Sequence, residues 1–206
     1  MIGIVNYQRG NLNNVYRAFE KFGFEAEIID ESDNLEKFKG IVLPGVGAFA
    51  DAMENLKEKN FDKAIVNYIQ TGKPFLGICL GLQLLFEKSL EFESCEGLGV
   101  FKGNVVPFEI DEKVPHIGWN QVNFKKPSNI IKDIPENEYF YFVHSYYVEP
   151  KEEDIILTTT RYGVDFVSSI EKDNIFACQF HPEKSQGAGL EIIKDFGEFC
   201  DRYSGN

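Results

Sequence analysis

The chain has 206 residues, of which 43% are hydrophobic and 26% are charged, and its formal net charge is −12. This length suits one domain over residues 1–206 with a sizeable buried core. The acidic balance argues against a nucleic-acid partner, because binding a polyanion requires a basic surface.

Hydrophobic runs in the sequence are all shorter than a membrane span, and the first residues lack the basic region and cleavage site of a signal peptide. We therefore expect a cytoplasmic protein without membrane association. The four cysteines, at positions 79, 95, 178 and 200, form no Cys-x-x-Cys pair. This spacing favours reduced thiols over a disulfide framework or a zinc ribbon, and we expect neither a metal nor an organic cofactor.

Strands and helices alternate in the first part of the chain. Short apolar runs predict strands at residues 2–5, 26–29, 40–47 and 75–78, the third ending in a glycine loop. Helical spacing of apolar residues predicts helices at 12–22, 49–56 and 65–72, and a further buried helix starting over 80–86. Alternation of this kind indicates an α/β fold with a doubly wound, mostly parallel central sheet.

The second half of the sequence has a different pattern. Short alternating runs separated by turn residues predict hairpins, mostly antiparallel, added to the sheet at residues 104–108, 121–124, 139–143, 155–160 and 164–170. A last apolar strand is predicted at 175–180 and a closing helix at 189–199. Acidic runs at 91–96 and 149–154 indicate solvated loops.

The pattern Gly-x-Cys-x-Gly surrounds Cys79, between the predicted strand at 75–78 and the helix after it. It is the thiol form of the strand-to-helix elbow in which a strained turn exposes a nucleophile and glycines allow close packing. A helix N-terminus beside the sulfur would favour the thiolate. The alternative is that Cys79 is a small buried hydrophobic residue, as most free cysteines are.

A possible base and its partner follow the last predicted strand, in Gln179-Phe-His181-Pro-Glu183. Functional groups gather at the carboxyl ends of strands in α/β sheets, and Cys79 and His181 both occupy such ends. His181 could take the thiol proton and give it to a leaving amine, while Glu183 orients the imidazole. The alternative is a histidine at the strand end that is merely capped by a neighbouring carboxylate.

The glycine loop Pro44-Gly-Val-Gly47 ends another strand at the same edge. Backbone N–H groups of Val46, Gly47 and Leu80 could stabilise negative charge on a substrate oxygen, although any strand-to-helix turn can require glycines. Gln83 could contact substrate or simply pack. His116 and His144 could be bases or ligands, but three histidines without close spacing make a poor metal site, so a structural role is favoured for both. Aromatic residues around 139–142, together with Trp119, could be core or a protein-binding face.

Taken together, these segments resemble the class I (triad) glutamine amidotransferases. The resemblance covers almost the whole chain and rests on Gly77-Ile-Cys79-Leu-Gly81-Leu-Gln83, Pro44-Gly-Val-Gly47, His144-Ser-Tyr146 and Gln179-Phe-His181-Pro-Glu183-Lys184-Ser185. Pro115-His-Ile-Gly-Trp-Asn120 is similar to the glutaminase subunits that serve imidazole glycerol phosphate synthase in histidine biosynthesis. The first loop departs from that pattern, with Asn6-Tyr-Gln-Arg-Gly-Asn11 where Asp-Tyr-Gly-x-Gly-Asn is usual.

The resemblance implies glutamine hydrolysis to glutamate and ammonia by Cys79, His181 and Glu183. It implies a heterodimer, in which the ammonia passes to a cyclase subunit of the (β/α)8 barrel type. Carried over residue by residue, Gly47, Gln83, Ser145 and Tyr146 are expected to bind glutamine. By the same carry-over, the residues facing the partner are expected to be Trp119, Tyr141 and Lys184.

Three other functions remain open at this stage. A related glutaminase subunit could supply ammonia to a different synthase, for example in amino-sugar formation. A non-catalytic module of the same fold would have no need of Cys79, His181 and Glu183 together. A cysteine peptidase or general hydrolase would not require Trp119 and the loop ending at Gly47.

Overall fold

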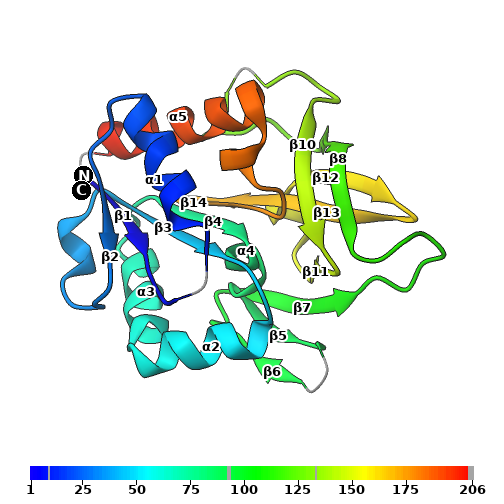
Figure 1. The fold of residues 1–206 in the computed structure, drawn as a ribbon, viewed down its shortest axis with the longest axis horizontal. Coiled ribbons are helices and arrows are strands. Elements are labelled where there is room, and N and C mark those ends of the chain that lie inside the picture. Colours follow the sequence, from blue (N-terminus) through cyan, green and yellow to red (C-terminus); the bar gives the residue numbers. More distant parts are fainter. Residues whose placement is uncertain (9, 92–93, 133, 204–206) are drawn as a thin grey trace.

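The structure is a computed structural model that describes residues 1–8, 10–91, 94–132 and 134–203, and a twisted sheet runs through its middle (Figure 1). Five neighbouring strands of this sheet are parallel. In spatial order they are β2 (Ala26–Ile29), β1 (Ile2–Val5), β3 (Gly40–Gly45), β4 (Phe75–Cys79) and β14 (Ile175–Cys178). The predicted parallel core is confirmed.

Helices cover both faces of these strands (Figure 1). One face carries α1 (Leu12–Lys21) and α5 (Gln186–Arg202), and the other carries α2 (Phe49–Glu58) and α3 (Phe61–Gln70). Side chains along a strand point alternately to the two faces, so Ile41 and Leu43 pack with α2 and α3 while Val42 packs with α1 and α5. Burial on both faces explains why these strands read as continuous apolar runs.

An antiparallel extension continues the sheet from β14. In spatial order it contains β13 (Val164–Lys172), β11 (Tyr146–Pro150), β7 (Phe101–Pro107), β5 (Phe86–Ser89) and β6 (Cys95–Glu96). A branch leaves it at β13, which pairs with β12 (Ile156–Tyr162), and β12 pairs in turn with β9 (Asn123–Phe124). All of these pairings are antiparallel except that of β5 with β7. The hairpin predicted over residues 155–170 is therefore present.

Residues 139–143 do not extend the central sheet, so that prediction is wrong. They lie in β10 (Tyr139–His144), which pairs with β8 (His116–Gln121) in a separate two-stranded sheet. The reason is that Phe140 and Phe142 pack beneath this small sheet, with Phe140 stacked on Phe180 at 4.2 Å between ring centroids. Alternation along a strand predicts which face is buried but not which strand is its neighbour.

The helix predicted to start over residues 80–86 is also shorter than expected. Helix α4 (Leu80–Gln83) makes one turn, and the chain enters β5 at Phe86, which pairs with Phe101. Every residue from 80 to 86 is buried. An apolar run buried on all sides has no polar face whose period would distinguish helix from strand.

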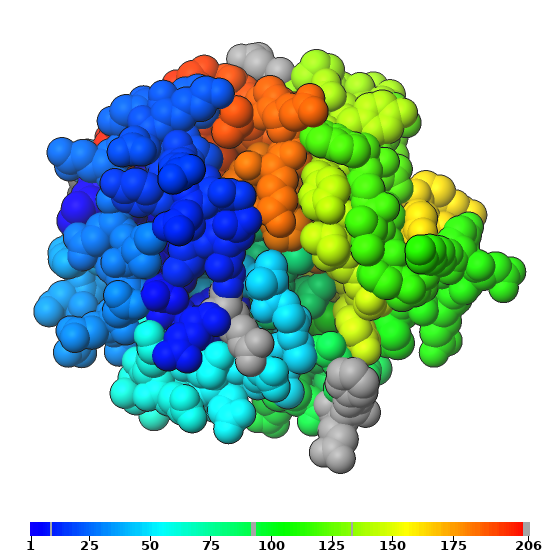
Figure 2. Space-filling view, in the orientation of Figure 1, coloured from blue at the N-terminus to red at the C-terminus, as the bar shows by residue number. Residues whose placement is uncertain are grey.

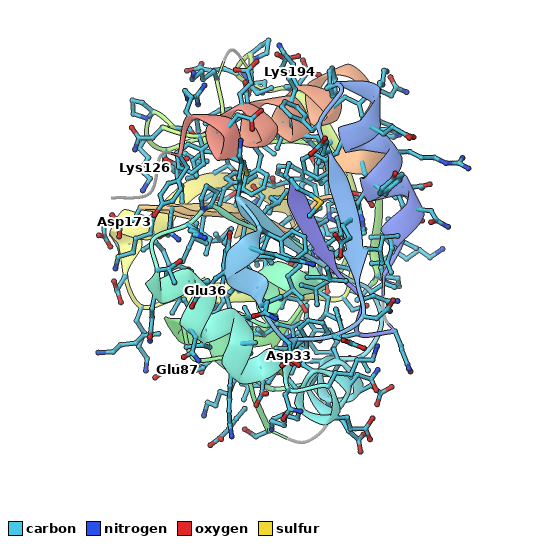
Figure 3. All side chains as sticks on the ribbon, turned by 90° about the vertical axis from the view of Figure 1, so that its left-hand side faces the viewer. Asp33, Glu36, Glu87, Lys126, Asp173 and Lys194 are labelled. Carbon is cyan, nitrogen blue, oxygen red and sulfur yellow. The ribbon has the colours of Figure 1, made fainter. Side chains whose placement is uncertain are left out.

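The remaining described segments are three 3-10 turns and connecting loops. The turns are η1 (Leu35–Lys37), η2 (Glu153–Ile155) and η3 (Pro182–Lys184). The charged side chains labelled in Figure 3 lie at the surface, where Asp33, Glu36 and Asp173 are exposed and Glu87, Lys126 and Lys194 are partly exposed. None of the helices in the described part of the chain combines the length and apolar character needed to cross a membrane.

Candidate active site

Cys79 occupies a strained turn between β4 and α4. Its φ of 54° and ψ of −108° lie outside the ordinary regions for a side-chain-bearing residue. Only glycine fits at position 81, because a Cβ atom at this position would overlap the carbonyl oxygen of Leu43. The predicted elbow is present. However, the one-turn α4 has too few aligned peptides for the expected helix dipole, which is a correction to that argument.

His181 and Glu183 approach the elbow from the neighbouring strand. β14 runs parallel to β4, with Cys178 opposite Ile78, so the chain leaves the sheet beside Cys79. The turn η3 then folds Glu183 back onto the imidazole. Its Oε1 lies 2.8 Å from His181 Nδ1, and the two side chains are 1% and 2% exposed. The structure thus brings together the three residues predicted to form the triad.

Hydrogen bonds to the main chain of His181 fix the segment that carries its ring. The His181 N–H donates to the carbonyl oxygen of Tyr141 at 2.9 Å, and Ser185 Oγ donates to the His181 carbonyl oxygen at 2.6 Å. Ser185 Oγ in turn accepts a hydrogen bond from the Tyr141 N–H at 2.9 Å. Figure 2 shows the orange segment that contains η3 and the start of α5 beside the yellow-green β10. The small sheet therefore braces the turn that carries the histidine.

The protonation of His181 is set by its two neighbours. Burial alone lowers the pKa of His181, but attraction to Cys79 and the hydrogen bond and charge of Glu183 outweigh burial and raise this pKa to about 10. An imidazolium beside the sulfur could protonate a leaving amine. The site thus holds a candidate acid next to the candidate nucleophile.

A cavity of about 460 Å³ opens in front of Cys79, a size that suits a small ligand. All the residues predicted to bind substrate or form an oxyanion hole line it, together with Lys184. The lining consists of Val46, Gly47, Cys79, Leu80, Gln83, Glu91, Pro115, Val143, His144, Ser145, Tyr146 and Lys184. Residues from six separate parts of the chain therefore meet at one cavity.

The glycine loop lies next to the nucleophile because β3 and β4 are neighbours, with Gly45 opposite Cys79. Val46 is 38% exposed, and Gly47 has a φ of 97°, which disfavours any residue with a side chain. Both residues line the cavity. The loop is thus placed where its peptide groups can reach a substrate held against Cys79.

Sequence reasoning missed Glu91, which was interpreted as part of a solvated acidic loop. Glu91 lines the cavity, and its Oε2 accepts a hydrogen bond from the Phe49 N–H at the start of α2 at 2.7 Å. Burial and the Glu91 charge raise the pKa of the Tyr146 hydroxyl. No local pattern marks this glutamate, because its role depends on a contact 42 residues away. Residues 92 and 93 of the acidic run, and Arg9 of the first loop, lie outside the described residues.

Trp119, Tyr141 and Lys184 lie together beside the cavity. The rings of Trp119 and Tyr141 are 6.1 Å apart on paired strands, and Lys184 Nζ lies 5.9 Å from the Tyr141 ring centroid. Trp119 is 45% exposed. Since Lys184 also lines the cavity, this group connects the cavity rim with an exposed aromatic surface.

The model of one protein family, Glutamine amidotransferase class-I, matches residues 4–198. Two solved structures share the fold. "Structure of PurLQS from Thermotoga maritima" aligns at TM-score 0.77 and 18% identity over 96% of this chain and 97% of that one. "Crystal structure of glutamine amidotransferase" aligns at TM-score 0.76 and 18% identity over 97% of this chain and 98% of that one. The chain belongs to the class-I glutamine amidotransferases.

Several curated relatives are far more similar in sequence. The "Imidazole glycerol phosphate synthase subunit HisH" of Aquifex aeolicus is 51% identical over 94% of this chain and 94% of its own length. The protein of the same name from Caldanaerobacter subterraneus subsp. tengcongensis is 49% identical over 96% of this chain and 98% of its own length. Within the class-I family, the chain is a member of this group of HisH subunits.

Proposed function

We propose that the chain hydrolyses glutamine to glutamate and ammonia, with Cys79 as nucleophile. The observation that carries this proposal is the buried His181–Glu183 pair beside a cysteine held at positive φ at the base of a cavity. The Cys79 thiolate attacks the carboxamide carbon, and His181 protonates the departing nitrogen, which leaves as ammonia. Water, deprotonated by His181, then attacks the thioester and releases glutamate, while Glu183 orients the ring and balances its charge.

The oxyanion of each tetrahedral intermediate requires donors that point at the substrate oxygen. We assign this role to backbone N–H groups of Val46, Gly47 and Leu80, because all three residues line the cavity around Cys79. Donors fixed in a partly buried site stabilise developing charge more strongly than water does.

The rest of the cavity offers groups for the amino-acid part of glutamine. Gln83, Ser145 and Tyr146 supply amide, hydroxyl and backbone groups, and Gly47 leaves room for close approach. Glu91 is the acidic residue of the lining. We assign it to the substrate α-ammonium group, because a charge-assisted hydrogen bond to a carboxylate is stronger than a neutral one.

The relatives are each named as one subunit of a synthase, which indicates a further subunit. We propose that this chain supplies ammonia to a cyclase partner of the (β/α)8 barrel type in histidine biosynthesis. An apolar strip on the outer face of β8 and β10 supports a heterodimer. Ile117, Trp119 and Tyr139 are 58%, 45% and 49% exposed, and aromatic residues are enriched at protein interfaces. At one end, Val143 pairs with Ile117 and also lines the cavity. A partner seated on this strip would meet ammonia at the cavity rim.

The decisive experiment compares two nitrogen sources. The complex of the chain with the cyclase is assayed for product formation with glutamine and with an ammonium salt. Cys79→Ala should abolish the glutamine-dependent reaction and leave the ammonium-dependent one intact, because only the first needs the thiol. Glutamine turnover by the alanine variant would refute the assignment of the nucleophile. Trp119→Ala serves as the interface control, with weaker co-purification of the partner expected.

A further inference from the structure

Two buried histidines outside the proposed triad form a chain of hydrogen bonds. Asn120 Nδ2, on β8, lies 3.3 Å from His116 Nε2. His116 Nδ1 lies 3.1 Å from His144 Nε2, and His144 Nδ1 lies 2.9 Å from the carbonyl oxygen of Tyr146. His116 is 3% and His144 6% exposed. The chain therefore runs inward from the small sheet to the segment that holds Ser145.

A second chain connects the same carbonyl oxygen to the nucleophile. Gln83 Nε2 donates to the Tyr146 oxygen at 3.0 Å and to Gln179 Oε1 at 3.0 Å. Gln179 Nε2 then donates to the sulfur of Cys79 at 3.6 Å. Gln179 is fully buried. Tyr146 O is thus an acceptor shared by both chains, and the contacts are continuous from Asn120 to Cys79.

The direction of donation along the first hydrogen-bond chain is set by the Tyr146 carbonyl at its end. A carbonyl oxygen only accepts, so His144 must carry its proton on Nδ1 and leave Nε2 bare. His116 must then donate from its own Nδ1, and its bare Nε2 accepts from the Asn120 amide. Every contact receives one proton only if both rings are neutral. Burial, which lowers the pKa of His116 to about 4 and that of His144 to about 3, agrees with this assignment.

Packing prevents the His116 ring from turning to another partner. It stacks between Tyr162, at 4.0 Å between centroids, and Phe142, at 5.0 Å. Phe166 borders both imidazoles without stacking on either, edge-on to His116 at 5.9 Å and tilted to His144 at 5.1 Å. The two stacked rings, Tyr162 and Phe142, therefore hold the imidazole of His116 in one orientation, as a group that positions another must be held.

We propose that His116 and His144 are positioning residues of the glutaminase reaction, which fix the Tyr146 carbonyl and through it both the Ser145 turn and the Gln83–Gln179 pair that donates to Cys79. The inference rests on the proposed function. The ring of His144 and the carbonyl of Tyr146 close a loop around Ser145, so its orientation toward the cavity depends on this bond. Gln83 can donate to Gln179 in the observed geometry only while its other hydrogen is directed at Tyr146.

The test uses His116→Phe, which keeps the ring stack but removes both hydrogen bonds. The readout is glutamine turnover by the complex with the cyclase. We expect kcat to fall about tenfold with little change in KM, because the buried His144 Nε2 loses its donor. His116→Asn should recover most of the activity, since its amide nitrogen replaces Nδ1. The matched control is Phe166→Leu, which loosens the same cluster without removing a hydrogen bond and should keep kcat at comparable thermal stability.

A double-mutant cycle separates positioning from a merely structural role. Gln179→Leu removes the hydrogen bond of the second chain to the sulfur. If the contacts act as one unit, the fall in kcat in the double variant should be smaller than the product of the falls in Gln179→Leu and His116→Phe alone. Multiplicative losses, or unchanged kcat in His116→Phe, would overturn the inference.

The tautomers give a readout that does not depend on activity. Nitrogen-15 NMR of the wild-type chain should show both imidazoles neutral and protonated on Nδ1 at pH 6. Protonation of either ring on Nε2 would also overturn the inference. A wild-type complex that does not turn over glutamine would instead refute the proposed function.

Discussion

Glu183 Oε1 lies 2.8 Å from His181 Nδ1, although the two side chains are only 1% and 2% exposed. Two ionisable groups so deeply buried are tolerated only as a hydrogen-bonded pair, because an isolated charge there would be far less stable. The pair therefore fixes the ring orientation and favours its charged form, which are the two properties that a cysteine nucleophile needs from its base.

Glu183→Gln should lower kcat by orders of magnitude without unfolding the chain. A neutral amide still fills the space, but it cannot balance the imidazolium and can select the wrong tautomer of His181. Steady-state glutamine turnover and a thermal melt of the same preparation test this. Unchanged turnover would mean that another group orients the histidine.

A glutamine analogue carrying an electrophile should label Cys79 alone. Burial raises the pKa of the thiols of Cys178 and Cys200, which keeps them protonated and unreactive. Cys95 is only half-buried, but it lies outside the residues that line the cavity. Peptide mass mapping after labelling measures the outcome, and modification mainly at Cys95 would contradict the assigned elbow.

Glu91→Gln should raise the KM for glutamine about tenfold and change kcat much less. The substitution removes the charge opposite the substrate ammonium but keeps an oxygen to accept from the Phe49 N–H. The matched control is Glu87→Gln. Glu87 Oε2 also accepts a backbone hydrogen bond, from the Gly103 N–H at 2.9 Å, but Glu87 does not line the cavity. An equal rise in KM for both variants would remove Glu91 from the substrate site.

Glutaminase activity should be weak in the chain alone and should rise when the cyclase and its nucleotide ligand are both present. Val46 is flanked by Gly45 and Gly47, so its peptide groups can reorient and place an N–H in the oxyanion hole only on activation. One such donor is worth roughly 10²–10³ in kcat, and we expect a rise of at least that size. Gly47→Ala should reduce this activation, because a residue with a side chain is strained at the φ of 97° that Gly47 adopts. Full turnover by the isolated chain would show that the hole is preformed.

Acid should destabilise the fold through His116 and His144. Their pKa values in the folded chain are lowered from 6.5 to about 4 and about 3. The unfolded chain therefore takes up protons first, and the free energy of unfolding declines as pH falls from 6.5 toward those values. His181 acts in the opposite sense, because its pKa is raised to about 10 and its contribution is lost as pH rises through that value.

Urea unfolding between pH 4.5 and 7 measures the acid effect. His116→Phe removes one of the two groups that take up a proton on unfolding. The slope of the free energy of unfolding against pH should therefore decrease by about 1.4 kcal/mol per pH unit at its steepest. A slope equal to that of the wild type would mean that His116 is already protonated in the folded chain.

Local patterns in the sequence were sufficient for the parallel core and for the three residues of the proposed triad. Strands buried on both faces read as apolar runs. The carboxyl ends of parallel strands lie at one edge of a sheet, so the sequence favoured a meeting of Cys79 and His181, and the pairing of β14 with β4 in the tertiary structure makes their strands neighbours. Glu183 followed because a proline turn returns it to the ring two residues later.

Contacts between distant segments were decided only by the tertiary structure. Helix α4 ends after one turn because the chain then enters β5, where Phe86 pairs with Phe101 of β7. The separate two-stranded sheet forms because aromatic residues pack beneath it. Glu91 reaches the cavity through a bond to α2, and Gln83 meets Gln179 across 96 residues. Sequence periodicity determines which side of an element is buried. It carries no information about which buried polar groups will share a hydrogen bond, because that choice is made by packing of the whole chain.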